Sequence, residues 1–301
     1  MNYTVSRVLV VILRTVFLVG MSFVMLYPVI FMLSAGFKSL QDVYDPTVVW
    51  LPQHFSLEPM KLALKVLNYG QSVMKTLSMT IPSVLLQLVT VLLAGYGFAR
   101  FHFRGKNILF ALLIFTIIVP VQSYMIPLYV NFKNFDYFGI GSLIGLITGH
   151  PVTTSLVNKD VLFYLQAALG MGIRSGLYIF MLRQFFRTIP VSLSECARLD
   201  GCSEFRIFWQ IVLPLCMPAL ATVAIFSFMF TWNDFMGPLL YINDKMAYTL
   251  SYGLRTFQLQ SDSKWHLTMA ASVVVAIPSL VLFFCCQKYF IEGIALTGLK
   301  E

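Results

Sequence analysis

Charged residues are scarce in this chain of 301 residues: only 11% are Asp, Glu, Lys or Arg, whereas 58% are hydrophobic. A soluble globular domain carries about a quarter charged residues. The shortage argues against an ordinary soluble domain, because the excess apolar surface must face something other than water. The apolar residues form long unbroken runs, which are typical of membrane-spanning helices rather than of a barrel of alternating strands.

Motifs for catalysis and metal binding are also missing. The sequence has no H-E-x-x-H pattern, no glycine-rich phosphate loop and no G-x-S-x-G elbow. The five cysteines include no C-x-x-C pair, and their odd number argues against a disulfide framework. The four histidines are dispersed: His54, His102, His150 and His266. We therefore expect no enzyme activity, metal or cofactor in this chain. If it moves a solute uphill, another chain must hydrolyse the nucleotide.

Basic residues outnumber acidic ones, 21 to 13, but they lie in loops and at helix ends rather than along one helix face. Membrane topology and anionic lipid headgroups account for this excess, so we expect lipid contact and no nucleic-acid partner. The short loop 99–107 contains Arg100, Arg104 and Lys106. The positive-inside rule places this loop in the cytoplasm, together with both termini and the segment 183–213.

Six apolar runs predict an all-α integral membrane protein with six transmembrane helices in a single domain, residues 1–301. The runs are 8–33, 76–98, 107–130, 161–182, 212–240 and 267–287. Pro120 and Pro127 predict a kinked or broken third helix. Residues 34–75 are expected to form an extracytoplasmic loop with a short surface helix near 58–68. An ion-coupled transporter or membrane enzyme acting alone would need ionisable groups in the runs, where Arg14 and Arg174 are nearly the only ones.

The segment Pro190–Pro218, called the polar segment below, concentrates charge within an apolar chain. Ser192 and Glu195 have the spacing of an S-x-x-E capping box. Gly201 predicts a helix end, and Ser203 predicts the cap of a second short helix. Pro214 predicts a break or kink. These signals predict helix, turn and helix, and they fit a solvated loop and a docking surface equally well.

The polar segment resembles the EAA loop of ABC importer permeases, whose pattern is E-A-A, three residues, G, nine residues and I-x-L-P. The matching stretches are Glu195-Cys196-Ala197, Asp200-Gly201 and Ile211-Val212-Leu213-Pro214. Cys196 departs from the pattern, since it replaces the middle alanine by another small residue. Similar stretches elsewhere are Ala94–Arg100, Pro127–Tyr129, Phe185–Pro190, Trp232–Phe235 and Tyr289–Gly293. The chain is most similar to the MalG-type subunit of maltose-like carbohydrate importers, with residues 150–161 as an insertion within an outer-face segment of about 143–161.

This resemblance implies a permease in the bacterial cytoplasmic membrane that imports a carbohydrate, in particular an oligosaccharide. It implies three kinds of partner: a second homologous permease, a dimer of ATP-binding subunits that carries ATP and Mg, and an extracytoplasmic solute-binding protein. The ATPase-coupling residues carried over are Glu195, Ala197, Asp200, Gly201, Leu213 and Pro214. The ending Gly298-Leu299-Lys300 resembles a tail that reaches the ATPase subunits. A permease for another solute, such as a glycerol phosphodiester or an osmolyte, remains an alternative.

Candidate substrate residues are polar or aromatic side chains near helix breaks. Trp232, Asn233 and Asp234 end the fifth run, and Gln122 and Tyr129 lie on the third. Sugars bind to aromatic faces and to fixed donors and acceptors, so these residues are candidates for the substrate path. An interfacial Trp followed by a helix-ending Asn-Asp would account for the first three equally well.

Overall fold

The computed structural model describes residues 3–150, 152–244, 247–260 and 264–298. The described backbone is helical without named strands, and its two isolated β-bridges join Lys38 to Phe55 and Phe135 to Thr154. Contacts divide the chain into two compact units, Met1–Tyr69 with Gly253–Pro278 and Gly70–Tyr252 with Ser279–Glu301. The last residues of the tail, 299–301, lie outside the described ranges.

The first unit contains a long N-terminal helix and short helices from the predicted outer loop. Its elements are α1 (Tyr3–Gly36), α2 (Leu40–Tyr44), α3 (Glu58–Val66) and the parts of α14 (Leu250–Gln260) and α15 (Trp265–Gly298) that belong to it. The expected surface helix near 58–68 is therefore confirmed as α3. Ala270 of α15 is fully buried, and a Cβ placed on Gly36 would lie 3.2 Å from its Cα. The absence of a side chain at Gly36 thus lets α1 pack closely against α15.

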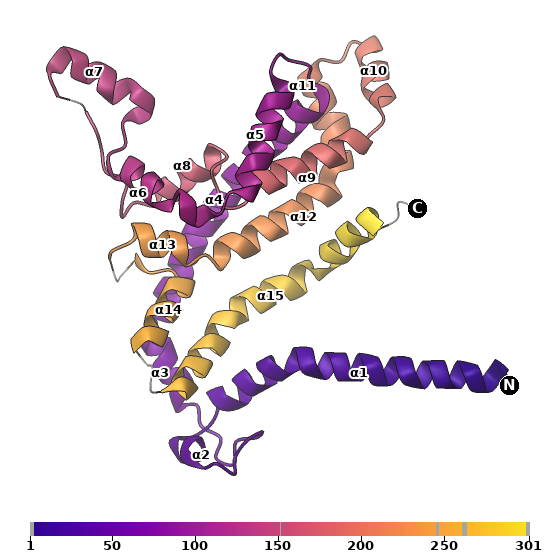
Figure 1. Ribbon diagram of the computed structural model, residues 1–301, viewed down its shortest axis with the longest axis vertical. Helices are drawn as coiled ribbons and strands as arrows, with labels where there is room; N and C mark the ends of the chain where they lie inside the picture. Colours follow the sequence, from indigo (N-terminus) through magenta and orange to yellow (C-terminus); the bar gives the residue numbers. More distant parts are fainter. Residues whose placement is uncertain (1–2, 151, 245–246, 261–263, 299–301) are drawn as a thin grey trace. The chain divides into compact units, whose positions relative to one another are not determined.

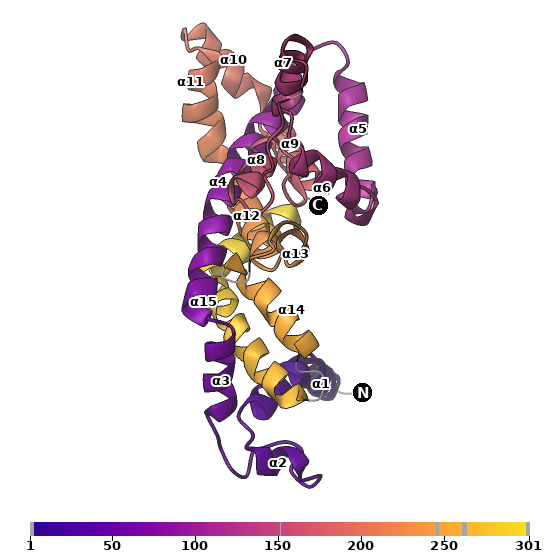
Figure 2. The same ribbon diagram turned by 90° about the vertical axis from the view of Figure 1, so that its left-hand side faces the viewer.

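The second unit contains the remaining elements (Figures 1 and 2). These are α4 (Tyr69–Arg100), α5 (Lys106–Ile118), η1 (Val121–Ser123), α6 (Met125–Lys133), η2 (Tyr137–Gly139), α7 (Ile140–Thr148), α8 (Val161–Ala168), α9 (Ser175–Thr188), α10 (Val191–Leu199), α11 (Glu204–Ile207), the π-helical η3 (Phe208–Val212), α12 (Leu213–Trp232) and α13 (Met236–Tyr241). Both views place α10 and α11 at one end of α12 and α13 at its other end.

Among the residues that the structure describes, four helical stretches are long and apolar enough to cross a membrane: Arg7–Gly36, Tyr69–Arg100, Glu204–Trp232 and Trp265–Cys285. They overlap the predicted first, second, fifth and sixth helices, although the fifth begins at Glu204 and ends at Trp232 rather than extending from 212 to 240. The chain is therefore a multi-pass membrane protein. The predicted third and fourth helices are each broken into two shorter ones, so six crossings remain a prediction.

The breaks in the third and fourth runs have identifiable causes. Helix α5 ends at Ile118, just before Pro120, which lacks an amide donor. The predicted break at Pro120 is thus confirmed. Between α8 and α9 the backbone turns left-handed at Gly170 and Arg174, with φ of 73° and 58°. A right-handed helix cannot continue through such residues.

The core of the second unit lies among α4, α9 and α12, with Tyr178, Leu182 and Phe186 of α9 at its centre. A Cβ placed on Gly95 would lie 3.0 Å from the Cβ of Leu182, so α4 and α9 approach as closely as a glycine allows. Arg100 closes this contact, since its Nη2 donates a 2.8 Å hydrogen bond to the carbonyl of Ile189. These contacts hold α4 and α9 together, and the polar segment follows directly after α9.

The predicted outer-face segment contains α7 and the loop before α8. Figure 1 shows α7 projecting away from α6 and α8. The following loop is fastened to the second unit, because Lys75 forms a half-buried ion pair with Asp160 at 2.6 Å. Tyr164 of α8 also donates a 2.7 Å hydrogen bond to the carbonyl of Ser78. The segment is therefore anchored to α4 at its C-terminal end.

Candidate functional site

The turn of the polar segment is a Schellman motif centred on Gly201, whose φ is 79°. The amide of Cys202 donates to the carbonyl of Ala197 at 2.9 Å, and the amide of Gly201 donates to that of Arg198 at 3.0 Å. Ser203 then caps α11, since its hydroxyl accepts from the amide of Arg206 at 3.4 Å. The predicted helix end at Gly201 and the predicted cap at Ser203 are both confirmed.

The predicted capping box at Ser192 and Glu195 is wrong. Helix α10 begins at Val191, and its N-cap is Pro190, which makes no side-chain capping bond. Proline suits this position because the first amides of a helix have no intrahelical partner. Ser192 therefore lies within the first turn, and both it and Glu195 are exposed.

The polar segment has an inner and an outer face. Ala197 is only 6% exposed and belongs to the core together with Ile207 and Phe208. On the outer face Glu195, Asp200 and Gly201 are exposed, as are two large apolar side chains, Leu199 at 89% and Phe205 at 73%. The structure thus presents carboxylates beside uncovered apolar groups on a rigid support.

Two contacts stiffen this support. Arg198 Nε donates a 2.5 Å hydrogen bond to Glu204 Oε1, which links α10 to α11 across the turn. Tyr96 of α4 lies with its ring centroid 4.8 Å from that of Phe208 and 5.5 Å from that of Phe186. The segment is therefore braced both internally and against the core.

Pro214 produces a change of helical register rather than a break. Residues 208–212 form the π-helix η3, and α12 continues directly from Leu213. A proline cannot donate to the carbonyl four residues earlier, and a π turn is one way to accommodate that loss within a continuous helix. Leu213 is half-buried and Pro214 is exposed.

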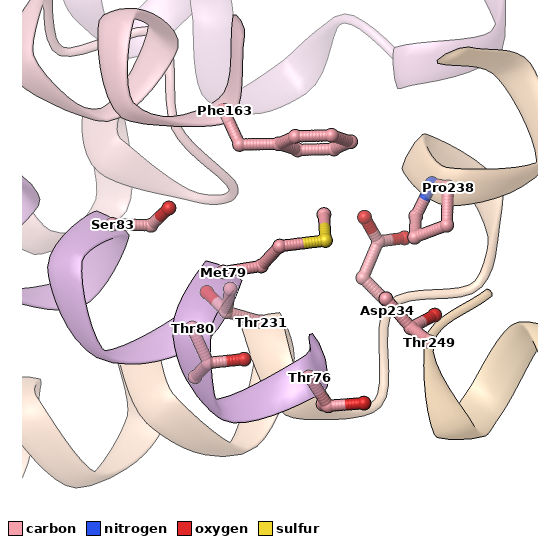
Figure 3. A pocket seen from close by; sticks show the side chains of 9 residues that line it. All are labelled: Thr76, Met79, Thr80, Ser83, Phe163, Thr231, Asp234, Pro238 and Thr249. Atoms are coloured by element: carbon pink, nitrogen blue, oxygen red, sulfur yellow. The ribbon is translucent and has the colours of Figure 1, made fainter. Parts of the chain in front are cut away.

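A small cavity lies at the other end of α12, as Figure 3 shows. It is called the Asp234 cavity below and has a volume of about 20 Å³, which is room for a water-sized group. Its lining comes from α4, α8, the end of α12, α13 and the start of α14: Thr76, Met79, Thr80, Ser83, Phe163, Thr231, Asp234, Pro238 and Thr249. The hydroxyls of Ser83 and Thr249 are buried and have no hydrogen-bond partner in the described part of the chain.

Asp234 is held in place by the backbone that follows it. Its carboxylate accepts hydrogen bonds from the amides of Met236 at 3.0 Å and Gly237 at 3.2 Å, which ties it to the start of α13. A Cβ placed on Gly237 would lie 2.5 Å from Asp234 Oδ2. Glycine at position 237 therefore lets the carboxylate sit against the backbone.

The other predicted substrate residues do not gather around the Asp234 cavity. Trp232 is 2% exposed and Asn233 is exposed, with its Nδ2 donating to the carbonyl of Met229 at 2.8 Å. Gln122 is exposed and does not line the cavity. Tyr129 stacks on Tyr241, with ring centroids 6.1 Å apart. Among the predicted residues, only Asp234 lines the cavity.

Sequence reasoning missed the polar face of α4. Thr76, Thr80, Ser83 and Gln87 are buried, and their spacing of four, three and four residues places them on one helix face. Gln87 Nε2 donates to Ser175 Oγ at 2.7 Å, and Ser227 Oγ donates to Gln87 Oε1 at 2.5 Å. The signal was present, because small polar residues at helical spacing within an apolar run indicate a buried polar face.

Metal binding has no support in the described residues, where no three His, Cys, Asp or Glu side chains gather.

The profile of one protein family, described as "Binding-protein-dependent transport system inner membrane component", matches residues 88–295. The chain belongs to this family. The match includes the polar segment, the C-terminal part of α4 from residue 88 onward, and the cavity residues Phe163, Thr231, Asp234, Pro238 and Thr249.

Relatives match this family member over most of its length. The probable starch degradation products transport system permease protein AmyC of Thermoanaerobacterium thermosulfurigenes is 28% identical over 93% of this chain and 94% of its own. The melibiose/raffinose/stachyose import permease protein MelC of Bacillus subtilis (strain 168) is 30% identical over 87% of this chain and 88% of its own. These relatives are transport permeases, in line with the expectation that the chain is not an enzyme.

The fold of this family member is also found in a solved structure. A chain of a bacterial ABC transporter involved in the import of the acidic polysaccharide alginate superposes with a TM-score of 0.74 at 22% identity. The superposition covers 96% of this chain and 99% of that chain. The all-helical structure is therefore an ABC transporter permease fold.

Proposed function

We propose that the chain is the permease subunit of an ATP-driven importer that carries an oligosaccharide across the bacterial cytoplasmic membrane. A second homologous permease completes the path, and a solute-binding protein delivers the sugar from outside. ATP and Mg bind to a separate dimer of ATPase subunits. The names of AmyC and MelC, which refer to starch degradation products and to melibiose, raffinose and stachyose, support a sugar as the substrate.

The polar segment is the coupling element in this proposal. The observation that carries it is the two-faced geometry, with Ala197 in the core while Glu195, Asp200 and Gly201 face outward. A rigid outer face with carboxylates and uncovered apolar groups fits a docking partner that has basic and apolar side chains. Leu213 and Pro214 join this face to the pore helix α12 through η3. Closure of the ATPase dimer then biases a pore with two states.

The proposed topology has six crossings, with the third and fourth helices broken. Both termini, the loop 99–107 and the polar segment lie in the cytoplasm. Asp234 follows the C-terminal end of α12, whereas the polar segment contains its N-terminal end, in line with a role in the substrate path. Trp232, Asn233, Gln122 and Tyr129 remain proposed path residues, although Trp232 is buried within this chain.

Two glycines allow a matched test of coupling. Gly201 and Gly105 both have left-handed φ, 79° and 84°, and neither has an atom within 4 Å of an added Cβ. Valine at either position strains the backbone by a comparable amount, on the order of 1–2 kcal/mol. In the assembled complex with its binding protein, Gly201→Val is expected to lower sugar-stimulated ATPase activity about tenfold. Gly105→Val should leave it near the wild-type level, and equal activity in both variants would contradict the proposal.

A permease for another solute remains the second candidate. A family member that imports a glycerol phosphodiester or an osmolyte would have the same coupling element. Uptake of a panel of radiolabelled oligosaccharides and of these solutes by the reconstituted complex separates the two. A transporter or membrane enzyme acting alone would work without ATPase subunits, which the same reconstitution tests.

A further inference from the structure

Arg174 is a cation within the fourth apolar run, at the N-terminal end of α9. It is the N-cap of α9, whose 14 residues end at Thr188 just before the polar segment. At 1.5 Å per residue, Arg174 lies about 21 Å from that end of the helix. In the proposed topology this places it within a hydrocarbon core of about 30 Å. An arginine at this depth is costly unless it faces protein or a water-filled path.

Gln87 forms hydrogen bonds to the residues on both sides of Arg174. Gln87 Nε2 donates to the carbonyl of Ile173 at 2.8 Å and to Ser175 Oγ at 2.7 Å. Arg174 itself has a φ of 58°, a conformation that costs a non-glycine residue on the order of 1–2 kcal/mol. Strain of this kind persists where the surroundings enforce it, and it gathers at ligand-binding sites. The structure therefore positions this side chain firmly.

The guanidinium has one covered face and a free edge. Its Cζ lies 3.9 Å from the centroid of the Phe230 ring, in a cation–π contact. Phe230 directly precedes Thr231, which lines the Asp234 cavity. The Arg174 side chain is exposed, and no carboxylate in the described ranges forms an ion pair with it. Arginine presents its donors as a planar fork that matches a carboxylate or a phosphate.

We propose that Arg174 selects a saccharide that carries an acidic group, with a uronic acid carboxylate as the preferred partner of the guanidinium. This inference rests on the proposed function, because it takes the path beside α9 and α12 to be a sugar path. Phe230 holds the guanidinium in orientation through its ring face. The carboxylate of an acidic sugar would form the ion pair that the Arg174 guanidinium lacks within the described residues. A neutral sugar of the same shape would bind without this attraction.

The test compares two disaccharides of matched shape, digalacturonate and α-1,4-galactobiose. Their binding to the complete transporter complex is measured by equilibrium dialysis in phosphatidylcholine nanodiscs, without the solute-binding protein and at two salt concentrations. The wild-type complex is expected to bind digalacturonate about tenfold more tightly, since a well-formed bond to a charged group contributes about 1.5 kcal/mol or more. High salt should reduce this preference.

Variants test whether the preference for digalacturonate depends on Arg174. Arg174→Gln is expected to reduce the ratio of the two affinities to about one, and Arg174→Lys is expected to retain part of it. If Arg174→Gln fails to fold, Arg174→Asn serves the same purpose, because asparagine tolerates the left-handed backbone. Arg14→Gln removes another arginine from an apolar run and should leave the ratio unchanged.

Three results would overturn the inference. An unchanged ratio in Arg174→Gln would do so while leaving sugar binding, and hence the proposed function, intact. A preference that vanishes when phosphatidylglycerol replaces phosphatidylcholine would assign the guanidinium to a lipid headgroup. If no oligosaccharide binds to the complex or is taken up by it, the proposed function fails and the inference fails with it.

Discussion

The polar segment contains the N-terminal end of α12, whereas the Asp234 cavity is lined by residues at its C-terminal end, and the two regions are built in opposite ways. The polar segment is local: its turn, its cap and its ion pair all join residues no more than six positions apart. The cavity joins side chains from Thr76 to Thr249, contributed by several separate helices. The first is a short structure that sits on a core, whereas the second exists only when the whole unit is folded.

This difference has consequences for mutation. A substitution on the outer face of the polar segment removes a contact to a partner and leaves the fold intact. A substitution in the cavity disturbs packing and polar contacts together, because buried polar groups are costly to leave unpaired. The sharpest tests therefore contrast neighbouring positions that differ only in which face they occupy.

The largest effect is expected at Ala197. Ala197→Phe places a large ring in the core beside Ile207 and Phe208, and overpacking of this kind costs about 1–3 kcal/mol. The neighbouring Cys196 is exposed, so Cys196→Ala should change stability by about 0.5 kcal/mol or less. Thermal unfolding of the purified complex measures both. Equal stability of the two variants would mean that α10 has no distinct inner face.

An intermediate effect is expected at Gly237 of the cavity. Gly237→Ala brings a Cβ within 2.5 Å of Asp234 Oδ2 and 3.3 Å of Phe163, so the carboxylate must leave its bonds to the backbone. We expect a net loss of about 1 kcal/mol, the typical value of a helix cap. In α14, Gly253→Ala meets only an ordinary 3.5 Å contact with Leu67 and should be neutral or stabilising.

A double variant identifies the cause of that loss. Asp234→Ala removes the carboxylate with which the new methyl group collides. Gly237→Ala should then cost less in the Asp234→Ala background than in the wild type, and a double-mutant cycle of thermal stabilities measures the difference. Purely additive costs would show that Asp234 is not what confines position 237.

The same contrast explains how far the sequence predicts this protein. Gly201, Ser203 and Pro120 act through their own backbone chemistry, so their turn, cap and break were predictable. The Ser192 capping box was mistaken because the N-cap is Pro190, two residues earlier than the pattern assumed. The residues around Asp234 could not be assembled, since the alignment of α4 against α12 and α13 depends on packing between distant segments. The break at Arg174 depends likewise on Gln87, which is 87 positions earlier in the chain.

The smallest effect concerns a contact between residues that are distant in the sequence, outside both regions. It joins Asp42 and His54 in the first unit. Asp42 is 2% exposed and accepts hydrogen bonds from the His54 amide at 2.8 Å and from its ring Nδ1 at 2.9 Å. Burial raises the pKa of Asp42, but these bonds and the charge of His54 outweigh burial and hold the pKa below its ordinary value. The carboxylate therefore stabilises the loop above about pH 3.9, the ordinary pKa, and loses this effect as the pH falls through its lower native value.

Hydrogen exchange of residues 37–56 between pH 7 and pH 3, corrected for the intrinsic pH dependence of exchange, measures this contribution. We expect protection in the wild type to be constant down to about pH 4 and to fall below it, because only then is the carboxylate protonated. Asp42→Asn should show weaker protection at neutral pH and no further fall. If the variant followed the wild type at every pH, the Asp42–His54 contact would have no part in holding this loop. The contrast between local and long-range contacts would then not extend to the first unit.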